Sequence, residues 1–274
     1  MLTNKVTRHG SFIFHSNDMI GKCLDQFGEW SEMELSFLLR LLNPGDVAVD
    51  VGAHIGTFTI PFAKKVGPLG AVIALEAQRL VFQNLVANVV INRLSNVRAH
   101  HVVCGRESYF VELVENTGDE TSNSGEYRVK PSARHQRNWY FTRAEPLDAL
   151  LSRLPKLKLI KIDVEGFEQE VLAGAQHTLR HLRPIIHCEC LNHSSMEFLG
   201  AVADEHRYRR FAASFVPFNP ENFFGRPPPK LPAGHRDTNV MLWPMERPLP
   251  SNLKAQEVTT FQDLERAPSP SWTT

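Results

Sequence analysis

Cysteine is scarce in this chain, and the few cysteines present form no pattern that would bind a metal or build a disulfide framework. Cys23, Cys104, Cys188 and Cys190 contain no C-x-x-C pair, the spacing typical of zinc sites and redox motifs. Free thiols persist in reducing compartments. We therefore expect four free thiols and a cytoplasmic protein.

Long apolar runs and a one-sided charge are also missing. No run approaches the roughly 20 apolar residues that a membrane-spanning helix needs, and the N-terminus lacks the basic-then-apolar pattern of a signal peptide. Thirty basic and thirty acidic side chains balance, so no overall field favours nucleic acid. The sequence predicts a protein with no membrane span and no nucleic-acid partner.

The dinucleotide fingerprint G-x-G-x-x-G is absent from the place where it would be expected. A hydrophobic strand, 47–51, runs through Asp50 and Gly52 to Gly56, but His54 stands where the second glycine of the fingerprint would be. This argues against NAD and against a bound pyrophosphate. The two remaining glycines still allow close approach of the backbone to a ligand. One alternative is a tight strand-to-helix turn without a ligand, and another is that Asp50 merely caps the end of the strand.

Glu76 complements this glycine turn, residues 50–56. It ends a second hydrophobic strand, twenty residues after Gly56, where a carboxylate can accept hydrogen bonds from both hydroxyls of a ribose. The turn and Glu76 together predict a site for an adenosine that carries no diphosphate.

Strands and helices alternate along most of the chain, which predicts an α/β fold with a doubly wound parallel sheet. A capping-box pattern at Ser31 and Glu34 marks the start of the first helix. A terminal hairpin should close the sheet with an antiparallel strand. The expected strands are 47–51, 71–76, 96–104, 108–114, 157–163, 184–189, 208–216 and 237–243, and the expected helices are 31–42, 55–66, 82–90, one from about 167, and one through 196–202.

The chain length suits one domain with additions at both ends. We expect an N-terminal helical segment at 1–43, the α/β domain at 44–244, and a poorly ordered tail at 245–274, where prolines and polar residues dominate. The polar stretch 116–138 reads as a loop whose basic residues are either solvated or bind a phosphate.

Several motifs closely resemble those of the FkbM family of S-adenosylmethionine-dependent methyltransferases. They are Asp50-Val51-Gly52-Ala53-His54-Ile55-Gly56, then the block Lys161-Ile162-Asp163-Val164-Glu165-Gly166-Phe167-Glu168, then 171–175, and finally 183–189. The resemblance runs from about Phe27 to Trp243. His54 departs from the asparagine that is more usual in the glycine motif.

This resemblance implies a class I methyltransferase, Rossmann-like fold that binds S-adenosyl-L-methionine. Family members commonly methylate hydroxyl groups on sugars, polyketides or other secondary metabolites, so a small-molecule or glycan hydroxyl is the implied acceptor. The candidate cofactor contacts are Asp50, Gly52, His54, Gly56, Glu76 and Asp163, with the glycine turn around the methionine part and Glu76 on the ribose.

Asp163 and Glu165 are the candidate catalytic residues, because they follow the fourth parallel strand at the sheet edge where ligands bind. Asp163 is the expected base for a hydroxyl acceptor, and Glu165 either orients it or caps the next helix. Glu189 ends the neighbouring strand. A structural role is preferred for it over shared Mg²⁺ binding with Asp163, so no metal is assigned. His187 is expected to be a core histidine.

Other functions stay open at this point. The acceptor is alternatively a nitrogen or a carboxylate on a peptide or a carrier-bound intermediate. A non-catalytic scaffold that retains the fold is the remaining alternative.

Overall fold

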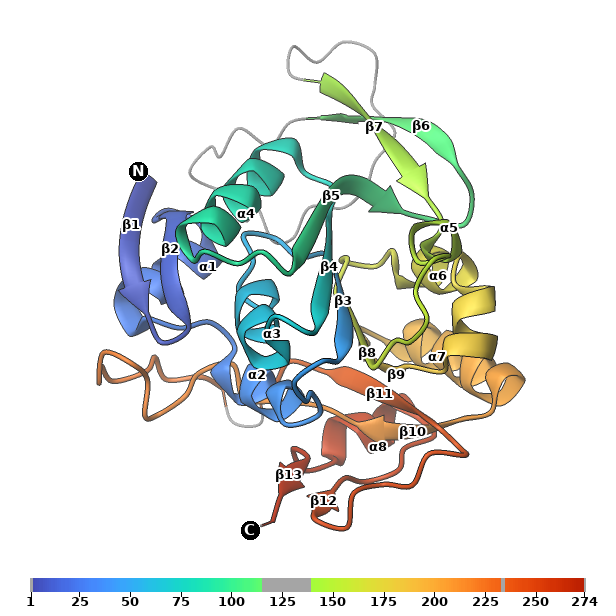
Figure 1. Ribbon diagram of the computed structural model, residues 1–274. Helices are drawn as coiled ribbons and strands as arrows, with labels where there is room; N and C mark the ends of the chain where they lie inside the picture. Colours follow the sequence, from blue (N-terminus) through green and yellow to red (C-terminus); the bar gives the residue numbers. More distant parts are fainter. Residues whose placement is uncertain (1, 115–138, 233–234, 274) are drawn as a thin grey trace.

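The computed structural model describes residues 2–114, 139–232 and 235–273 (Figure 1). Its centre is a nine-stranded sheet with the order β10-β11-β9-β8-β3-β4-β5-β7-β6. The strands are β3 (Val47–Val51), β4 (Ala71–Glu76), β5 (Val97–Cys104), β6 (Tyr109–Val114), β7 (Trp139–Glu145), β8 (Leu159–Ile162), β9 (Ile185–Glu189), β10 (Tyr208–Ala212) and β11 (Asn239–Pro244).

The sheet is mostly parallel, as predicted. All neighbours from β9 across to β7 pair in parallel. Antiparallel pairing occurs at the two edges, where β11 lies between β9 and β10 and where β6 pairs with β7. The predicted antiparallel terminal hairpin is therefore confirmed.

Helices cover both faces of the sheet, which makes it doubly wound. Figure 1 places α2, α3 and α4 on one side of the sheet and α5, α6 and α7 on the other. The helices are α1 (Met19–Phe27), α2 (Glu32–Leu39), α3 (Thr59–Val66), α4 (Arg79–Ile91), α5 (Leu147–Leu150), α6 (Glu168–Ala173), the π-helix η2 (Thr178–Leu182), α7 (His193–His206) and α8 (Phe261–Arg266). Across the described ranges, each helix is too short or too polar to act as a membrane span.

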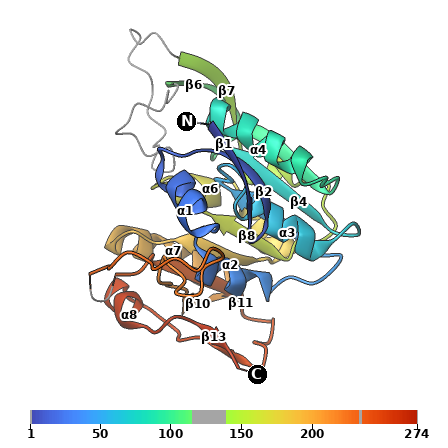
Figure 2. The same cartoon turned by 90° about the vertical axis from the view of Figure 1, so that its left-hand side faces the viewer.

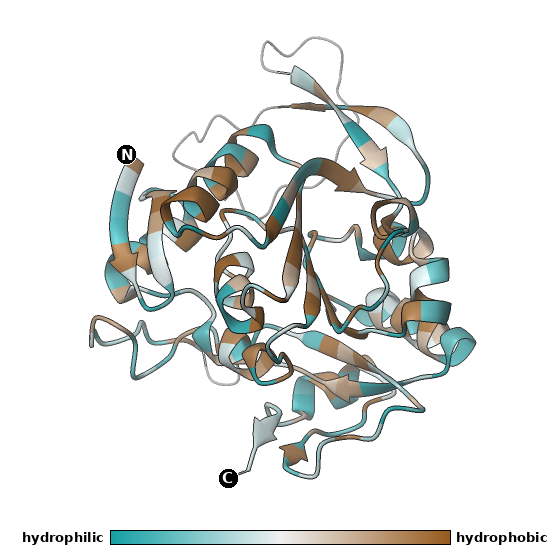
Figure 3. Ribbon diagram, viewed as in Figure 1, coloured by the Kyte–Doolittle hydropathy of each residue, from teal (hydrophilic) through white to brown (hydrophobic). Residues whose placement is uncertain are grey.

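The strand period of two divides the core between these faces. Val49 packs in the cluster that contains Leu172 and Leu199 of α6 and α7, whereas Ala48 packs in the cluster that contains Leu38 and Phe62 of α2 and α3. Successive side chains of a strand point to opposite faces. Figure 3 shows the resulting concentration of hydrophobic residues in the central strands.

The sheet order reverses at β3, which positions the site. After β3 the chain builds β4 and β5 on one side, and it later returns to add β8 and β9 on the other. Ligands of open α/β sheets bind beyond the carboxyl ends of the strands at such a switch point. A ligand site is therefore expected at the carboxyl ends of β3 and β8.

The N-terminal segment is not wholly helical, so that prediction is wrong for its first part. A hairpin of β1 (Leu2–Thr7) and β2 (Gly10–His15) precedes α1 and α2. Asn88 of α4 attaches the hairpin to the domain: Ile13 N–H donates to Asn88 Oδ1 at 2.7 Å, and Asn88 Nδ2 donates to Ile13 O at 3.0 Å. This anchor lies far away in sequence, where local patterns carry no information about it.

The outer edge of the sheet holds a strand that the sequence did not predict. The expected strand at 108–114 is confirmed as β6, but its partner β7 was missed. Residues 116–138, interpreted as a loop with a basic cluster, lie outside the described residues.

The C-terminal tail is structured between residues 245 and 273, so the prediction of a poorly ordered tail is wrong for this stretch. It forms β12 (Leu253–Lys254), α8 and β13 (Ser271–Trp272). Val258 and Leu264 are buried in the same cluster as α6 and α7. Figure 2 shows α8 beside β10 and β11. The few apolar residues of the tail pack into the core, and this burial orders the segment although most of its residues are polar.

All four cysteines are free and buried. This confirms the expectation of free thiols.

Candidate active site

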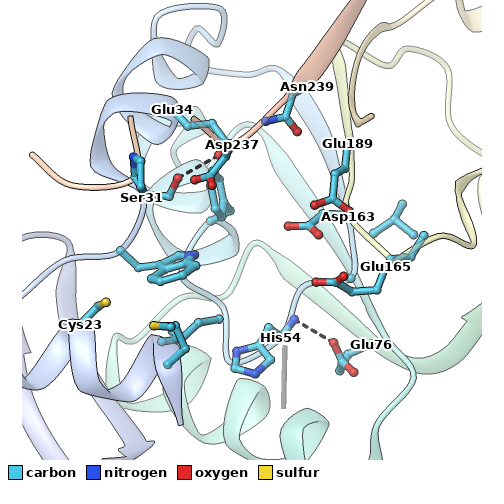
Figure 4. Close-up of a pocket in the computed structure, with 18 of the residues that line it drawn as sticks. Cys23, Ser31, Glu34, His54, Glu76, Asp163, Glu165, Glu189, Asp237 and Asn239 are labelled. Atoms are coloured by element: carbon cyan, nitrogen blue, oxygen red, sulfur yellow. Dashed lines mark hydrogen bonds between the residues drawn. The ribbon is translucent and has the colours of Figure 1, made fainter. Parts of the chain in front are cut away.

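A cavity of about 760 Å³ opens at the carboxyl edge of the sheet. Gly52, Glu76 and Asp163 line it from the ends of β3, β4 and β8, and Glu189 lines it from the end of β9. Figure 4 shows these side chains converging from segments that are far apart in the sequence. The cavity therefore brings together most of the residues that the sequence singled out.

Gly52 is the position where only glycine fits. Its φ is +78°, and a Cβ there would lie 1.8 Å from the Asp163 carbonyl oxygen. The N–H groups of Gly52 and Ala53 both donate to Leu75 O, at 2.9 and 3.0 Å. The turn is thus fixed between β4 and the end of β8, with its backbone exposed to the cavity.

Asp50 and Gly56, two of the expected cofactor contacts, are not among the residues that line the cavity. Asp50 is fully buried, and its Oδ2 accepts a hydrogen bond from Thr59 Oγ1 at 2.6 Å. Burial raises its pKa, with Lys161 acting in the opposite direction. A Cβ on Gly56 would meet Leu85 Cδ1 at 2.9 Å. Both residues therefore pack inside the fold next to the turn and not in the cavity lining.

His54 lines the cavity and is 8% exposed. Its φ is +49°, a left-handed conformation in which histidine and asparagine are enriched among non-glycine residues. Burial lowers the pKa of its imidazole to about 4. His54 is therefore a neutral group near pH 7, positioned by the turn.

Glu76, the expected ribose contact, is held at the end of β4 by backbone hydrogen bonds. It lines the cavity, and its two oxygens accept the N–H groups of His54 at 2.8 Å and Gln78 at 2.7 Å. Burial raises its pKa to about 7, although these backbone hydrogen bonds favour the ionised form. The backbone thus orients this carboxylate before any ligand binds.

Asp163 and Glu165 meet at the other part of the cavity. Lys161, itself buried, donates from Nζ to Asp163 Oδ2 at 3.0 Å and lies 3.9 Å from Asp50 Oδ1. Glu165 has a φ of +52° and lines the cavity. The N-cap of α6 is Phe167, so Glu165 does not occupy the capping position that was its alternative role.

Glu189 joins these two residues in an acidic cluster, defined here as Asp163, Glu165 and Glu189. One carboxylate oxygen from each lies within 4.8 Å of the others. Burial, with Asp163 and Glu165 adding their negative charge, raises the pKa of Glu189 to about 9. Glu189 therefore shares its surroundings with the two candidate catalytic residues.

Sequence analysis missed several lining residues because they come from segments outside the motifs. Glu34 belonged to the predicted capping box, but Ser31 Oγ donates to its Oε2 at 2.9 Å and its Oε1 lies 2.8 Å from His187 Nε2. His187 is thus a buried core histidine, as predicted, with Glu34 as the partner of its Nε2. Other missed lining residues are Trp30, Asp237 and Asn239.

The neighbours of Glu189 have structural roles. Asn192 caps α7 by accepting from Ser195 N–H at 3.0 Å, and the His193 ring lies 5.0 Å from that of Phe261. Of the aromatic residues in the proline-rich loop, Phe218 lines the cavity. Phe223 and Phe224 instead pack near Gly28, where they would meet an added Cβ.

A family model for the methyltransferase FkbM domain matches residues 50–211, from the glycine turn to β10. The chain belongs to this family. Its sheet is the class I methyltransferase, Rossmann-like fold that the motifs implied. The match contains Gly52, Glu76, Asp163 and Glu189, whereas the rest of the cavity lining includes residues on either side of it, such as Trp30 and Asn239.

Two methyltransferases are similar to this FkbM-family chain. Methyltransferase 1 of Beauveria bassiana (strain ARSEF 2860) is 28% identical over 142 residues, which cover 46% of this chain and 57% of that protein. Methyltransferase sdnD of Sordaria araneosa is 29% identical over 155 residues, covering 46% and 59%. The chain thus spans less than two thirds of the length of either relative.

Among solved structures, the crystal structure of Methyltransferase FkbM from Methylobacillus flagellatus KT is similar, with 17% sequence identity and a TM-score of 0.48. The match covers 72% of this chain and 43% of that one.

Proposed function

We propose that this chain transfers the methyl group of S-adenosyl-L-methionine to a hydroxyl group on a sugar, a glycan or a secondary metabolite. One observation carries the proposal. A single cavity holds the backbone-oriented carboxylate of Glu76 and the acidic pair Asp163 and Glu165, and the Gly52 turn lines it as well. A donor site and an acceptor site are thus contiguous.

The residues at the donor side fit an adenosine. Backbone N–H groups donate to both oxygens of Glu76, and because a carboxylate has about four lone-pair sites, it can still accept a hydrogen bond from a ribose hydroxyl. Val102, Val103 and Phe167 add apolar lining, which suits the flat face of a base. S-adenosyl-L-methionine, when bound, supplies an electrophilic methyl group on sulfur.

At the acceptor side, Asp163 is the base. The acceptor oxygen must attack the methyl carbon in line with the breaking carbon–sulfur bond, so positioning is the main demand on the protein. Lys161 holds one oxygen of Asp163. The other oxygen takes the hydroxyl proton as the new carbon–oxygen bond forms, and Glu165 orients the acceptor beside it.

The charge of the cavity separates the alternative acceptors. Its described lining includes six carboxylates but one lysine, Lys22. A carboxylate acceptor would be repelled there, because like charges at short range cost free energy. A protonated amine would be attracted and would pass one proton to a carboxylate of the lining before its free nitrogen attacks the methyl carbon, so nitrogen methylation of an amine is the second candidate.

Calorimetry of the purified chain tests the donor. We expect S-adenosyl-L-methionine and its demethylated product to bind, and Glu76→Ala to weaken binding by about 1 to 3 kcal/mol, because a charge-assisted contact is lost. Glu107→Ala removes an exposed glutamate outside the cavity and should leave affinity unchanged. Absence of binding to the unaltered chain would end the proposal.

Asp163→Asn tests the acceptor. We expect methyl transfer to a hydroxyl acceptor to fall by about 10²–10⁴-fold, the contribution of a positioned base, while donor binding measured by calorimetry persists. Unchanged turnover with intact donor binding would contradict the base role and favour an amine acceptor. Screening hydroxyl and amine acceptors for methyl release, with a cell extract as the first source, distinguishes both from a non-catalytic scaffold.

A further inference from the structure

The acidic cluster at the acceptor side of the cavity is held together by the sheet itself. Asp163 and Glu189 follow from β8 and β9, which are parallel neighbours. Across the next pair, Asn239 of β11 is the direct register partner of Glu189. Directly opposed residues of an antiparallel pair have side chains on the same face, with Cβ atoms about 4.5–5.5 Å apart. Asn239 therefore faces the cluster.

We infer that Asp163, Glu165, Glu189 and Asn239 form a binding site for one divalent cation, of the Mg²⁺ or Mn²⁺ class. The three carboxylates each offer an oxygen within 4.8 Å of the others. Carboxylate and amide oxygens are the ligands that these hard cations prefer.

Polar groups without partners distinguish this site from an ordinary acidic surface. Oε2 of Glu189 is buried and has no hydrogen-bond partner within the described part of the chain. Asn239 is 6% exposed and lines the cavity, and its side-chain amide makes no hydrogen bond to the residues that the structure describes. Figure 4 shows this amide pointing into the cavity near Glu189. Buried polar groups are normally paired, so Oε2 of Glu189 lacks a partner that a cation would supply, and the Asn239 amide faces the same cavity.

The surroundings of the cluster also fit a cation. Lys161 pairs with Asp163, and the carboxyl groups of Glu165 and Glu189 lie close to it and to one another. A divalent ion bound among the three would replace the proton that their proximity favours on Glu189. The side chain of Asp163 is 43% exposed, so the site opens to the cavity and leaves room for water or a hydroxyl oxygen in the coordination sphere, as Mg²⁺ requires.

The test uses Mn²⁺ as the probe, with the full chain and without S-adenosyl-L-methionine. Electron paramagnetic resonance of free Mn²⁺ should show one saturable site that Mg²⁺ competes for. Glu189→Gln and Asn239→Ala should each weaken Mn²⁺ binding by at least about tenfold. Because no methyl donor is present, the result is independent of the proposed function.

Asp237→Asn is the matched control, since Asp237 lines the same cavity but is not a member of the cluster. It should change Mn²⁺ affinity by less than about threefold. Thermal unfolding followed by circular dichroism confirms that each variant is folded. The inference is overturned if the unaltered chain shows no saturable binding up to about 1 mM Mn²⁺, or if Asp237→Asn weakens binding as much as Glu189→Gln.

Discussion

At the scale of single residues, burial and pairing decide which acidic groups can meet a ligand. Asp50 lies one residue before the end of β3 and Glu76 is the last residue of β4, and both are less than one tenth exposed. Thr59 donates to Asp50 inside the fold, whereas Glu76 lines the cavity. Both acids read alike in the sequence as the end of a hydrophobic strand, so the difference lies in their exact position and in what packs around each.

His54 gives a pH-dependent prediction at this scale. Burial lowers its pKa from 6.5 to about 4, so between these values the unfolded chain binds a proton that the folded chain does not. Stability must then fall as pH decreases through this window. Between pH 7 and pH 5, the unaltered chain should lose about 2 kcal/mol of unfolding free energy through His54.

His54→Asn should remove that loss, because asparagine does not titrate and tolerates the same left-handed backbone. Urea unfolding of both proteins at pH 7 and pH 5 measures it. Other titrating groups are common to the two proteins and cancel in the comparison. An identical loss of stability in both would show that His54 is not the group responsible.

At the scale of elements, the glycine turn works as a spacer between β3 and the segment after β8. Gly52 and Gly45 have similar positive φ values, +78° and +85°, but an added Cβ at Gly45 meets nothing within 4 Å. At Gly52 the same atom would collide with the Asp163 carbonyl. Alanine substitutions at the two glycines therefore separate two contributions to the free energy of unfolding. One is the cost of a side chain at positive φ, and the other is the cost of a steric clash with the Asp163 carbonyl.

Gly45→Ala should lower the free energy of unfolding by about 1 kcal/mol, the cost of alanine at positive φ. Gly52→Ala should cost a further 1 to 3 kcal/mol or so, because the Asp163 backbone must shift. It should also weaken donor binding, while Gly45→Ala should not. Chemical denaturation and calorimetry provide both readouts. Equal effects of the two substitutions would contradict the spacer role.

At the scale of the whole molecule, the two ends of the chain are integrated with the α/β domain. The N-terminal hairpin is tied to α4, and the tail adds Leu264 to the core beneath α6 and α7. The cavity at the carboxyl edge of the sheet also draws on distant segments, because its lining residues range from Met19 to Asn239.

Leu264→Ala should therefore destabilise the protein by about 2–5 kcal/mol, as for a fully buried leucine. Gln262→Ala, at an exposed position of the same helix, should stay within about 0.5 kcal/mol of the unaltered chain. Equilibrium unfolding measures both. A negligible effect of Leu264→Ala would mean that the tail packs without contributing to stability.

The sequence by itself determined the alternation of strands and helices, the terminal hairpin, the glycine turn and the position of Glu76, Asp163 and Glu165 at or just after the carboxyl ends of strands. These features are local, because hydrophobic period, turn residues and strand ends are written in neighbouring positions. The family motifs extended the same local information to the fold.

Tertiary structure alone decided which of those residues share a cavity. It placed Asp50 and Gly56 behind the turn, brought Glu34 to His187, and set Asn239 opposite Glu189. It also gave order to the hairpin and tail, whose few apolar residues find partners only in distant segments. Register between strands and long-range burial depend on the whole packed chain, so no local pattern could have specified them.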